Sequence, residues 1–210
     1  MREPDFFDPL DYDSLGRSVA RALIESEPFP LVEVEPFEGM GLYALTYTGG
    51  FGPYHLLADA NRAGKPWPIY VGKADSGKGS RKGNNDATVQ GKDGSTALYN
   101  RINKHRRSID SVDNLEVSDF QIRLMTMPPV WVPVAEQWTI RQYSPLWNQI
   151  VDGFGNHDPG TGRHGTAISV WDTLHPGRTA SWTANLVSRS DTPEQIAREI
   201  ERRLRETQPK

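Results

Sequence analysis

The chain has 210 residues, of which 36% are hydrophobic and 24% are charged, and its formal net charge at pH 7 is −3. These values fit one globular domain with a substantial core, and no apolar run approaches the roughly 20 residues that a membrane span needs. Cysteine is absent, which excludes disulfides, thiol nucleophiles and cysteine-based zinc sites, and no apolar signal segment follows the N-terminus, so we expect a soluble, cytoplasmic protein.

The first predicted element is an amphipathic helix over residues 14–25, capped by Asp13 or Ser14. Its apolar positions on one face are Leu15, Val19, Ala22 and Leu23. Two strands are predicted next, over residues 41–48 and 68–72, and they form an antiparallel pair. The connection between these strands contains a short helix at residues 54–62.

A basic segment follows the second strand. Residues 73–107 carry nine Lys or Arg against three Asp, whereas residues 1–40 carry ten Asp or Glu against three Arg. Within the basic segment, residues 75–96 are rich in Gly, Lys, Asn and Ser, which predicts a mobile loop. Because basic surfaces attract phosphate, this segment is typical of a nucleic-acid interface despite the negative net charge.

The helix predicted over residues 97–108 packs Leu98 and Ile102 inward. Arg101 and His105 are four residues apart and therefore share a neighbouring face of this helix.

Residues 120–126 alternate with period two and predict a third strand, and residues 133–143 predict a helix that begins at a proline. Ser144 and Pro145 close that helix, so that Asn148 returns toward the sheet. Residues 152–183 are rich in Gly, Pro and His and predict irregular structure. The last helix begins with a capping box at residues 192–195, and its buried side carries Ile196, Ile200 and Leu204.

The polar residues occur in a distinctive order. Gly-Leu-Tyr43 lies on one strand and Tyr70-Val-Gly72 on the next, and the later helices and their connection carry, in chain order, Arg101, His105, Glu136 and Asn148. This order resembles the GIY-YIG nuclease superfamily, and the surrounding sequence resembles its small type II restriction endonuclease branch, which cuts GC-rich palindromes of the CCGCGG type. Leu42 and Val71 replace the isoleucines that name the family, and 26 residues separate the two tyrosines, more than is usual.

The resemblance implies an α/β (α+β) fold with a small central antiparallel three-stranded sheet flanked by helices. We predict an N-terminal helical arm over residues 1–38, a nuclease core over 39–150 that includes the basic loop, and a DNA-contacting extension with a final helix over 151–210. The expected activity is hydrolysis of double-stranded DNA in a prokaryotic cell by a homodimer. One Mg²⁺ per active site is expected, which Mn²⁺ can replace, and a DNA methyltransferase is the expected genetic partner.

Phosphodiester hydrolysis needs an activated water, neutralised phosphoryl charge and help for the departing oxygen. Glu136 suits Mg²⁺ as a hard oxygen ligand, and Arg101 offers phosphate a planar donor fork. The resemblance implies that Tyr43 is the general base. Since an unperturbed phenol is a poor base, His105, a neighbouring cation or the metal has to assist it.

Tyr70 and Asn148 are the remaining polar residues of this order. Tyr70 is expected to hydrogen-bond the phosphate or the water, but the residues alone do not decide between the two tyrosines. Asn148 is expected to be a brace that ties the chain to the core.

Six basic residues are predicted to contact DNA. On the basic loop these are Lys78, Arg81, Lys82 and Lys92, and in the C-terminal extension Arg163 and Arg178 are predicted to reach guanine. Two alternatives differ from a restriction enzyme: a repair or homing nuclease, which usually has long extra domains, and a non-catalytic DNA-binding module.

Overall fold

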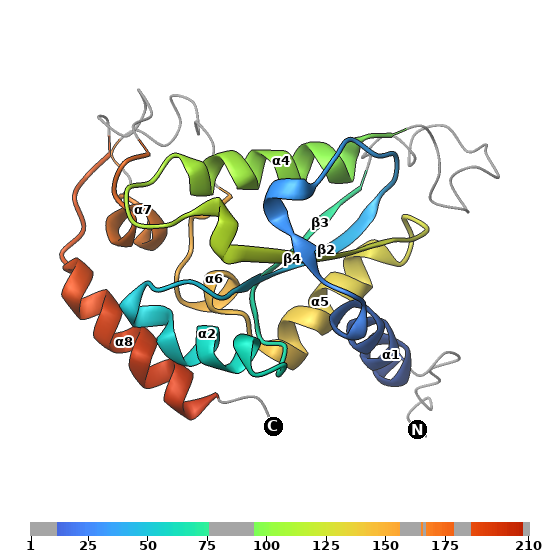
Figure 1. Cartoon of the computed structure of the whole chain (residues 1–210), viewed down its shortest axis with the longest axis horizontal. Helices are drawn as coiled ribbons and strands as arrows, with labels where there is room; N and C mark the ends of the chain where they lie inside the picture. Colours follow the sequence, from blue (N-terminus) through green and yellow to red (C-terminus); the bar gives the residue numbers. More distant parts are fainter. Residues whose placement is uncertain (1–11, 76–94, 156–164, 166, 179–185, 208–210) are drawn as a thin grey trace, which may run out of the picture.

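The computed structural model describes residues 12–75, 95–155, 165, 167–178 and 186–207 (Figure 1). Its strands are β1 (Phe29–Pro30), β2 (Gly41–Tyr47), β3 (Pro68–Ala74) and β4 (Phe120–Thr126). Its α-helices are α1 (Tyr12–Glu25), α2 (His55–Arg62), α4 (Ala97–Asp110), α5 (Val132–Tyr143), α6 (Leu146–Gln149), α7 (Val170–Leu174) and α8 (Pro193–Glu206), and its 3-10 helices are η1 (Leu31–Glu33), η2 (Gly52–Tyr54) and η3 (Val117–Asp119). No described helix is long and apolar enough to cross a membrane.

The central strand β2 is buried along its whole length. It pairs antiparallel with β3 on one side and with β4 on the other. Because side chains alternate along a strand, Tyr43 and Leu45 enter one hydrophobic core, whereas Leu42 and Ala44 enter a second core on the opposite face. Helices α2, α4, α6, α7 and α8 build the first core, and α1 and α5 build the second.

The sheet confirms the predicted mixed α/β fold, with one additional strand. The order of strands is β1-β4-β2-β3, so the three predicted strands are joined by the two-residue β1. In β1, Phe29 pairs with Ile122 and Pro30 pairs with Gln121. Pro30 fits this position because β1 is an edge strand, and one side of an edge strand needs no hydrogen-bond donor.

Helix α1 confirms the predicted amphipathic helix, but its ends and its face differ from the prediction. It begins at Tyr12, so Asp13 and Ser14 lie within the first turn and do not cap it. Ala22 is exposed, whereas Ala20 is buried. The buried face is shifted because α1 packs against α5, where Gly16 lies so close to Trp138 that a Cβ atom would overlap the indole ring.

The C-terminal part contains more regular structure than predicted. The region expected to be irregular includes α7, a short helix whose Trp171 is fully buried. Ser169 caps α7 by accepting a hydrogen bond from the backbone N–H of Asp172. The final helix α8 has the predicted capping box between Thr192 and Gln195, and its predicted apolar residues are all buried.

A buried polar chain joins α7 to the rest of the core. The indole N–H of Trp147 donates to the Tyr54 hydroxyl oxygen at 2.9 Å. The Tyr54 hydroxyl lies 2.7 Å from Nε2 of His175, and Nδ1 of His175 lies 2.8 Å from Oδ1 of Asn114. Since Oδ1 of Asn114 only accepts, the proton of neutral His175 is on Nδ1, and Tyr54 therefore donates to Nε2. Every polar atom of this chain therefore has a partner without a charge on the ring.

Acid is expected to destabilise the protein through His175. Burial lowers its pKa to about 3, from an ordinary value of 6.5. Between these values the unfolded chain binds a proton that the folded chain excludes, so the stability present above pH 6.5 is lost as the pH falls toward 3, at about 1.4 kcal/mol per pH unit. Denaturant unfolding of wild type and His175→Gln between pH 7 and 4.5 measures this. The free energy of unfolding of the variant should depend less on pH than that of the wild type. An equal pH dependence in both proteins would contradict the assignment of this effect to His175.

Candidate active site

Tyr43 and Tyr70 lie on neighbouring strands and on the same face of the sheet. In the β2–β3 register Tyr43 is opposite Gly72, and Tyr70 pairs two residues further along β2. The ring centroids of the two tyrosines are 6.0 Å apart. A Cβ atom at position 72 would lie 2.6 Å from the Tyr43 hydroxyl oxygen and 2.8 Å from the Tyr70 ring. Glycine at this position therefore makes room for both phenols.

Helix α4 adds Arg101 and His105. The residues buried along this helix are Leu98, Ile102, His105 and Ile109. Because residues four apart adjoin on a helix, Arg101 lies one turn before His105, beside the same face. Nδ1 of His105 is 3.2 Å from the Tyr43 hydroxyl oxygen, and the imidazole centroid is 5.0 Å from that of the Tyr70 ring. The helix thus holds a titratable ring against both tyrosines.

Burial and a nearby cation act in opposite directions on the two phenols. Burial raises the pKa of Tyr43 well above 10, and it also raises the pKa of Tyr70. The Arg101 guanidinium opposes this effect at both tyrosines, through its positive charge and through hydrogen bonds. A buried phenolate needs such a partner. Arg101 is therefore the residue that lowers the cost of removing a proton from either phenol.

Helix α5 brings Glu136 to the same group. Its Oε2 atom lies 3.0 Å from Nζ of Lys73 on β3, and both side chains are partly exposed. The carboxylate is near enough to Tyr70 for its negative charge to raise the pKa of that phenol. Five of the residues predicted for the active site, Tyr43, Tyr70, Arg101, His105 and Glu136, thus come together from β2, β3, α4 and α5.

The carboxylate of Glu136 is a suitable ligand for Mg²⁺. This ion commonly binds one or two carboxylates and keeps several waters, which a substrate phosphate can replace. Within the described residues no group of three or more His, Asp or Glu side chains encloses a metal position. Glu136, with 20% of its side chain exposed, is instead a single carboxylate accessible from solvent. It is the residue that would hold Mg²⁺ together with a bound phosphate.

Asn148 ties the chain to the edge strand beside Tyr70. Its Oδ1 atom accepts a hydrogen bond from the backbone N–H of Val71, and its Nδ2 atom donates to the carbonyl oxygen of Val71, each at 2.8 Å. The chain reaches this point because Ser144 ends α5 in a left-handed conformation with φ of 43° and Pro145 starts α6. Asn148 therefore satisfies both backbone groups of one residue on the open edge of the sheet.

A pocket of about 280 Å³ opens beside the site, between the end of β3 and the first turns of α4. Among the described residues, three cationic side chains line it, from Lys73, Arg101 and Lys104. Asn100 adds an amide, and Asp75 is the acidic residue in the lining. Because Lys73 and Arg101 also belong to the active-site group, the pocket is continuous with it. Its balance of charge suits a phosphate group.

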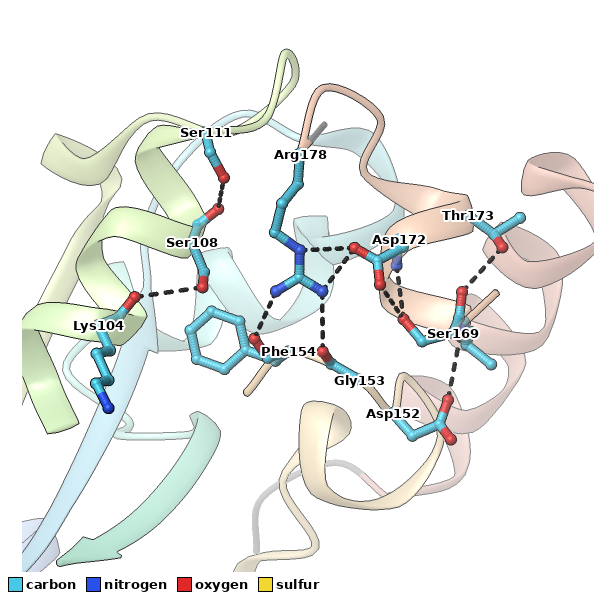
Figure 2. A network of polar contacts seen from close by, with 11 residues as sticks. Lys104, Ser108, Ser111, Asp152, Gly153, Phe154, Ser169, Asp172, Thr173 and Arg178 are labelled. Carbon is cyan, nitrogen blue, oxygen red and sulfur yellow. Dashed lines mark hydrogen bonds and ion pairs between the residues drawn. The ribbon is translucent and has the colours of Figure 1, made fainter. Parts of the chain in front are cut away.

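The structure describes one of the six residues that are predicted to contact DNA. Five of them lie outside the described residues: Lys78, Arg81, Lys82, Lys92 and Arg163. Arg178 is described, and the structure places its guanidinium within the protein rather than on an exposed surface. Its guanidinium pairs with Asp172 at 2.6 Å, donates to two backbone carbonyl oxygens, and leaves only 11% of the side chain exposed (Figure 2). A guanidinium held in this way does not present its donor fork to a base.

Three contributors to the site were not predicted. Lys73 directly follows the motif glycine, and the alternation of a strand places it with Val71 on the face that α5 covers, a signal that was present in the sequence. Phe154 packs 4.4 Å from His105, centroid to centroid, and Gly155 lies against the same histidine. Both belong to a stretch without periodicity, which offered no comparable signal.

Comparison with known proteins gives one family. The family model described as RE_Eco29kI, the Eco29kI GIY-YIG domain, matches residues 35–204. This span covers most of the chain and includes every residue of the site described above. No curated protein matches the chain.

Proposed function

Because the chain belongs to the Eco29kI GIY-YIG domain family of restriction endonucleases, we propose that it is a Mg²⁺-dependent type II enzyme that cuts double-stranded DNA at a short GC-rich palindrome. The observation that carries this proposal is the convergence of two tyrosines, an arginine and a histidine beside an accessible carboxylate, with a cationic pocket adjoining them. Each of these groups matches one requirement of phosphodiester hydrolysis.

The proton of the attacking water is taken by the Tyr43–His105 pair. The hydroxyl oxygen of Tyr43 accepts the proton while its own proton passes to Nδ1 of His105, 3.2 Å away. This transfer avoids a free phenolate in a buried position, where burial has raised the pKa of Tyr43. It requires His105 to be neutral, with its proton on Nε2.

The phosphoryl group is held by the cationic side of the site. Arg101 donates to its oxygens, and Tyr70 hydrogen-bonds the same group or the attacking water. The water oxygen forms a bond to phosphorus as the bond to the 3′ oxygen breaks. When Mg²⁺ is bound at Glu136, it supplies further neutralisation of the charge that develops on these oxygens. In the absence of the ion, the Lys73 ammonium pairs with the Glu136 carboxylate and balances its negative charge.

We propose that the active enzyme is a homodimer. One compact site cuts one strand, so a palindrome is matched by a two-fold homodimer that presents two sites. The neighbouring phosphates follow the pocket that Lys73 and Lys104 line. A methyltransferase that modifies the same sequence is the expected genetic partner, and Mn²⁺ is expected to replace Mg²⁺.

Arg101→Lys is expected to slow cleavage at least tenfold, which corresponds to about 1.4 kcal/mol in the activation free energy. Lysine keeps the positive charge but loses the planar fork that contacts phosphate and both phenols together. Single-turnover cleavage with enzyme in excess measures this effect. Arg107→Lys on the last turn of α4 is the matched control. A rate close to that of the wild type would assign Arg101 a structural role only.

Digestion of a plasmid by the purified protein tests the proposed function. Discrete fragments that require Mg²⁺ or Mn²⁺ and disappear with a chelator are the expected result. Random nicking would indicate a repair-type nuclease, and a single cut at one long site would indicate a homing-type nuclease. Binding without any cleavage would indicate a non-catalytic DNA-binding module. Each of these three results would contradict the proposal.

A further inference from the structure

Residues 152–155, which follow α6, form one wall of the active site. Phe154 is buried, and its ring centroid lies 4.4 Å from that of His105 and 5.0 Å from that of Tyr70, edge to face in both cases. At the next residue, Gly155, a Cβ atom would lie 3.0 Å from Nη2 of Arg101 and 3.2 Å from Nε2 of His105. The backbone of this segment therefore touches both functional residues of α4.

This wall has no regular secondary structure to hold it. Gly153 has φ of 103°, which lets the chain turn immediately before Phe154. Neither Gly153 nor Gly155 has a side chain with which to pack. The Phe154 ring packs against Trp147 and Trp171, and the backbone on either side of it is positioned by the groups that bind its carbonyl oxygens.

Arg178 binds that backbone directly. Its Nη1 atom donates to the carbonyl oxygen of Phe154, and its Nη2 atom donates to the carbonyl oxygen of Gly153, each at 3.1 Å. Its Nε atom donates to Oδ1 of Asp172 at 2.7 Å, and its guanidinium lies 4.6 Å from the centroid of the Trp171 ring. Figure 2 shows Arg178 between Asp172 and these two carbonyl groups.

The acceptor Asp172 is itself fixed by α7. Only 7% of its side chain is exposed, and the Ser169 hydroxyl donates to its Oδ2 atom at 2.6 Å. The N-terminus of α7 also holds the wall from the other side, because the backbone N–H of Trp171 donates to the carbonyl oxygen of Asp152 at 2.9 Å. Hydrogen bonds from α7 and from Arg178 therefore fix the backbone of residues 152–154 at both ends.

We propose that Arg178 and Asp172 are positioning residues of the nuclease, which act on His105 and Tyr70 through Phe154. This inference rests on the proposed function. The planar guanidinium directs separate N–H donors at the carboxylate and at the two carbonyl oxygens, an arrangement that the compact ammonium of lysine does not reproduce. Without these hydrogen bonds the wall can move away from His105, and the His105 ring then loses its support. The proton transfer from Tyr43 to His105 depends on the orientation of that ring.

Arg178→Lys tests the proposal, because lysine keeps the positive charge beside Asp172 but lacks the three separate nitrogen atoms with which Arg178 reaches the carboxylate and the two carbonyl oxygens. The single-turnover rate of DNA cleavage should fall roughly ten- to a hundredfold, as expected for a small displacement of a reacting group. The dissociation constant for DNA should stay within about twofold. The His105 ring signals in ¹H–¹⁵N spectra of the protein without DNA should shift. Arg202→Lys, which alters an arginine with two carboxylate partners on the exposed face of α8, is the control and should change none of these.

Gly155→Ala is the second variant, since it leaves Arg178 in place and adds a methyl group against Arg101 and His105. It should also lower the rate and shift the His105 signals, which tests the contact between this segment and His105. Asp172→Asn, which removes the charge that Arg178 pairs with, tests the positioning role if Arg178→Lys does not fold. Unchanged rate and ring signals in a folded variant would overturn the proposal. A parallel loss of melting temperature, DNA affinity and rate would also overturn it, because that pattern indicates a structural role only. Absence of cleavage by the wild type would instead refute the proposed function, while the ring signals would still test the contact.

Discussion

Tyr43→Phe is expected to lower the single-turnover rate of DNA cleavage by roughly 10²- to 10⁴-fold, the contribution of a positioned general base. The Tyr43 hydroxyl is the atom that meets Nδ1 of His105, so its removal breaks the proton path at its first step. The phenylalanine ring still fills the buried position on β2. Folding and DNA affinity should therefore change little, which thermal melts and binding titrations can verify.

Tyr70→Phe is the matched comparison, because its ring lies on the same face of the sheet and 6.0 Å from that of Tyr43. It should have the smaller effect, since it removes a hydrogen bond to phosphate or water and leaves the Tyr43–His105 contact intact. Single-turnover rates at several pH values distinguish the two variants. If Tyr43→Phe cuts at the normal rate, or if Tyr70→Phe alone removes the pH dependence, then the roles of the two tyrosines are the reverse of those assigned.

Glu136→Gln is expected to reduce cleavage by at least three orders of magnitude, because the amide keeps the shape of the side chain but removes the charge that would bind Mg²⁺. Specific DNA binding should persist. Calorimetric titration of the wild-type protein and the variant with Mg²⁺ in the presence of DNA should show weaker metal binding by the variant. This provides a readout that does not depend on turnover.

The controls for this variant address charge and the ion pair. Glu199→Gln on the exposed face of α8 removes a carboxylate that also pairs with a cation, and should leave cleavage unchanged. Lys73→Met removes the partner of Glu136, and it distinguishes loss of the ion pair from loss of the metal ligand. Retained cleavage by Glu136→Gln would rule out the metal-ligand assignment.

Much of the fold follows from local signals. The period-two pattern of β4 and the capping box of α8 predicted both elements with their correct starts, because alternation follows from the pleat of a strand and a capping box satisfies free N–H groups in the first turn of a helix. The functional residues on β2, β3, α4 and α5 were identified from their order along the chain. The order of these residues along the chain does not, however, predict the distances between their side chains.

Long-range packing decides the features that were missed. The shift in register between Leu45 and Thr46 places Ile69 and Tyr70 on the same face, and no sequence period encodes this bulge. The role of Arg178 depends on a carboxylate six residues earlier and on carbonyl groups 24 and 25 residues earlier. Its glycine- and proline-rich surroundings suggested an exposed arginine that reads DNA, whereas α7 folds back and buries it.

Metal-dependent cleavage of DNA at one short sequence is the activity that we propose for this chain. Sequencing the ends of fragments that the wild-type protein releases from a large DNA in the presence of Mg²⁺ tests it most directly. The predicted result is that all ends fall at one recurring GC-rich palindrome, with none produced by Glu136→Gln. Ends distributed at random, or ends that Glu136→Gln produces equally well, would contradict the claim.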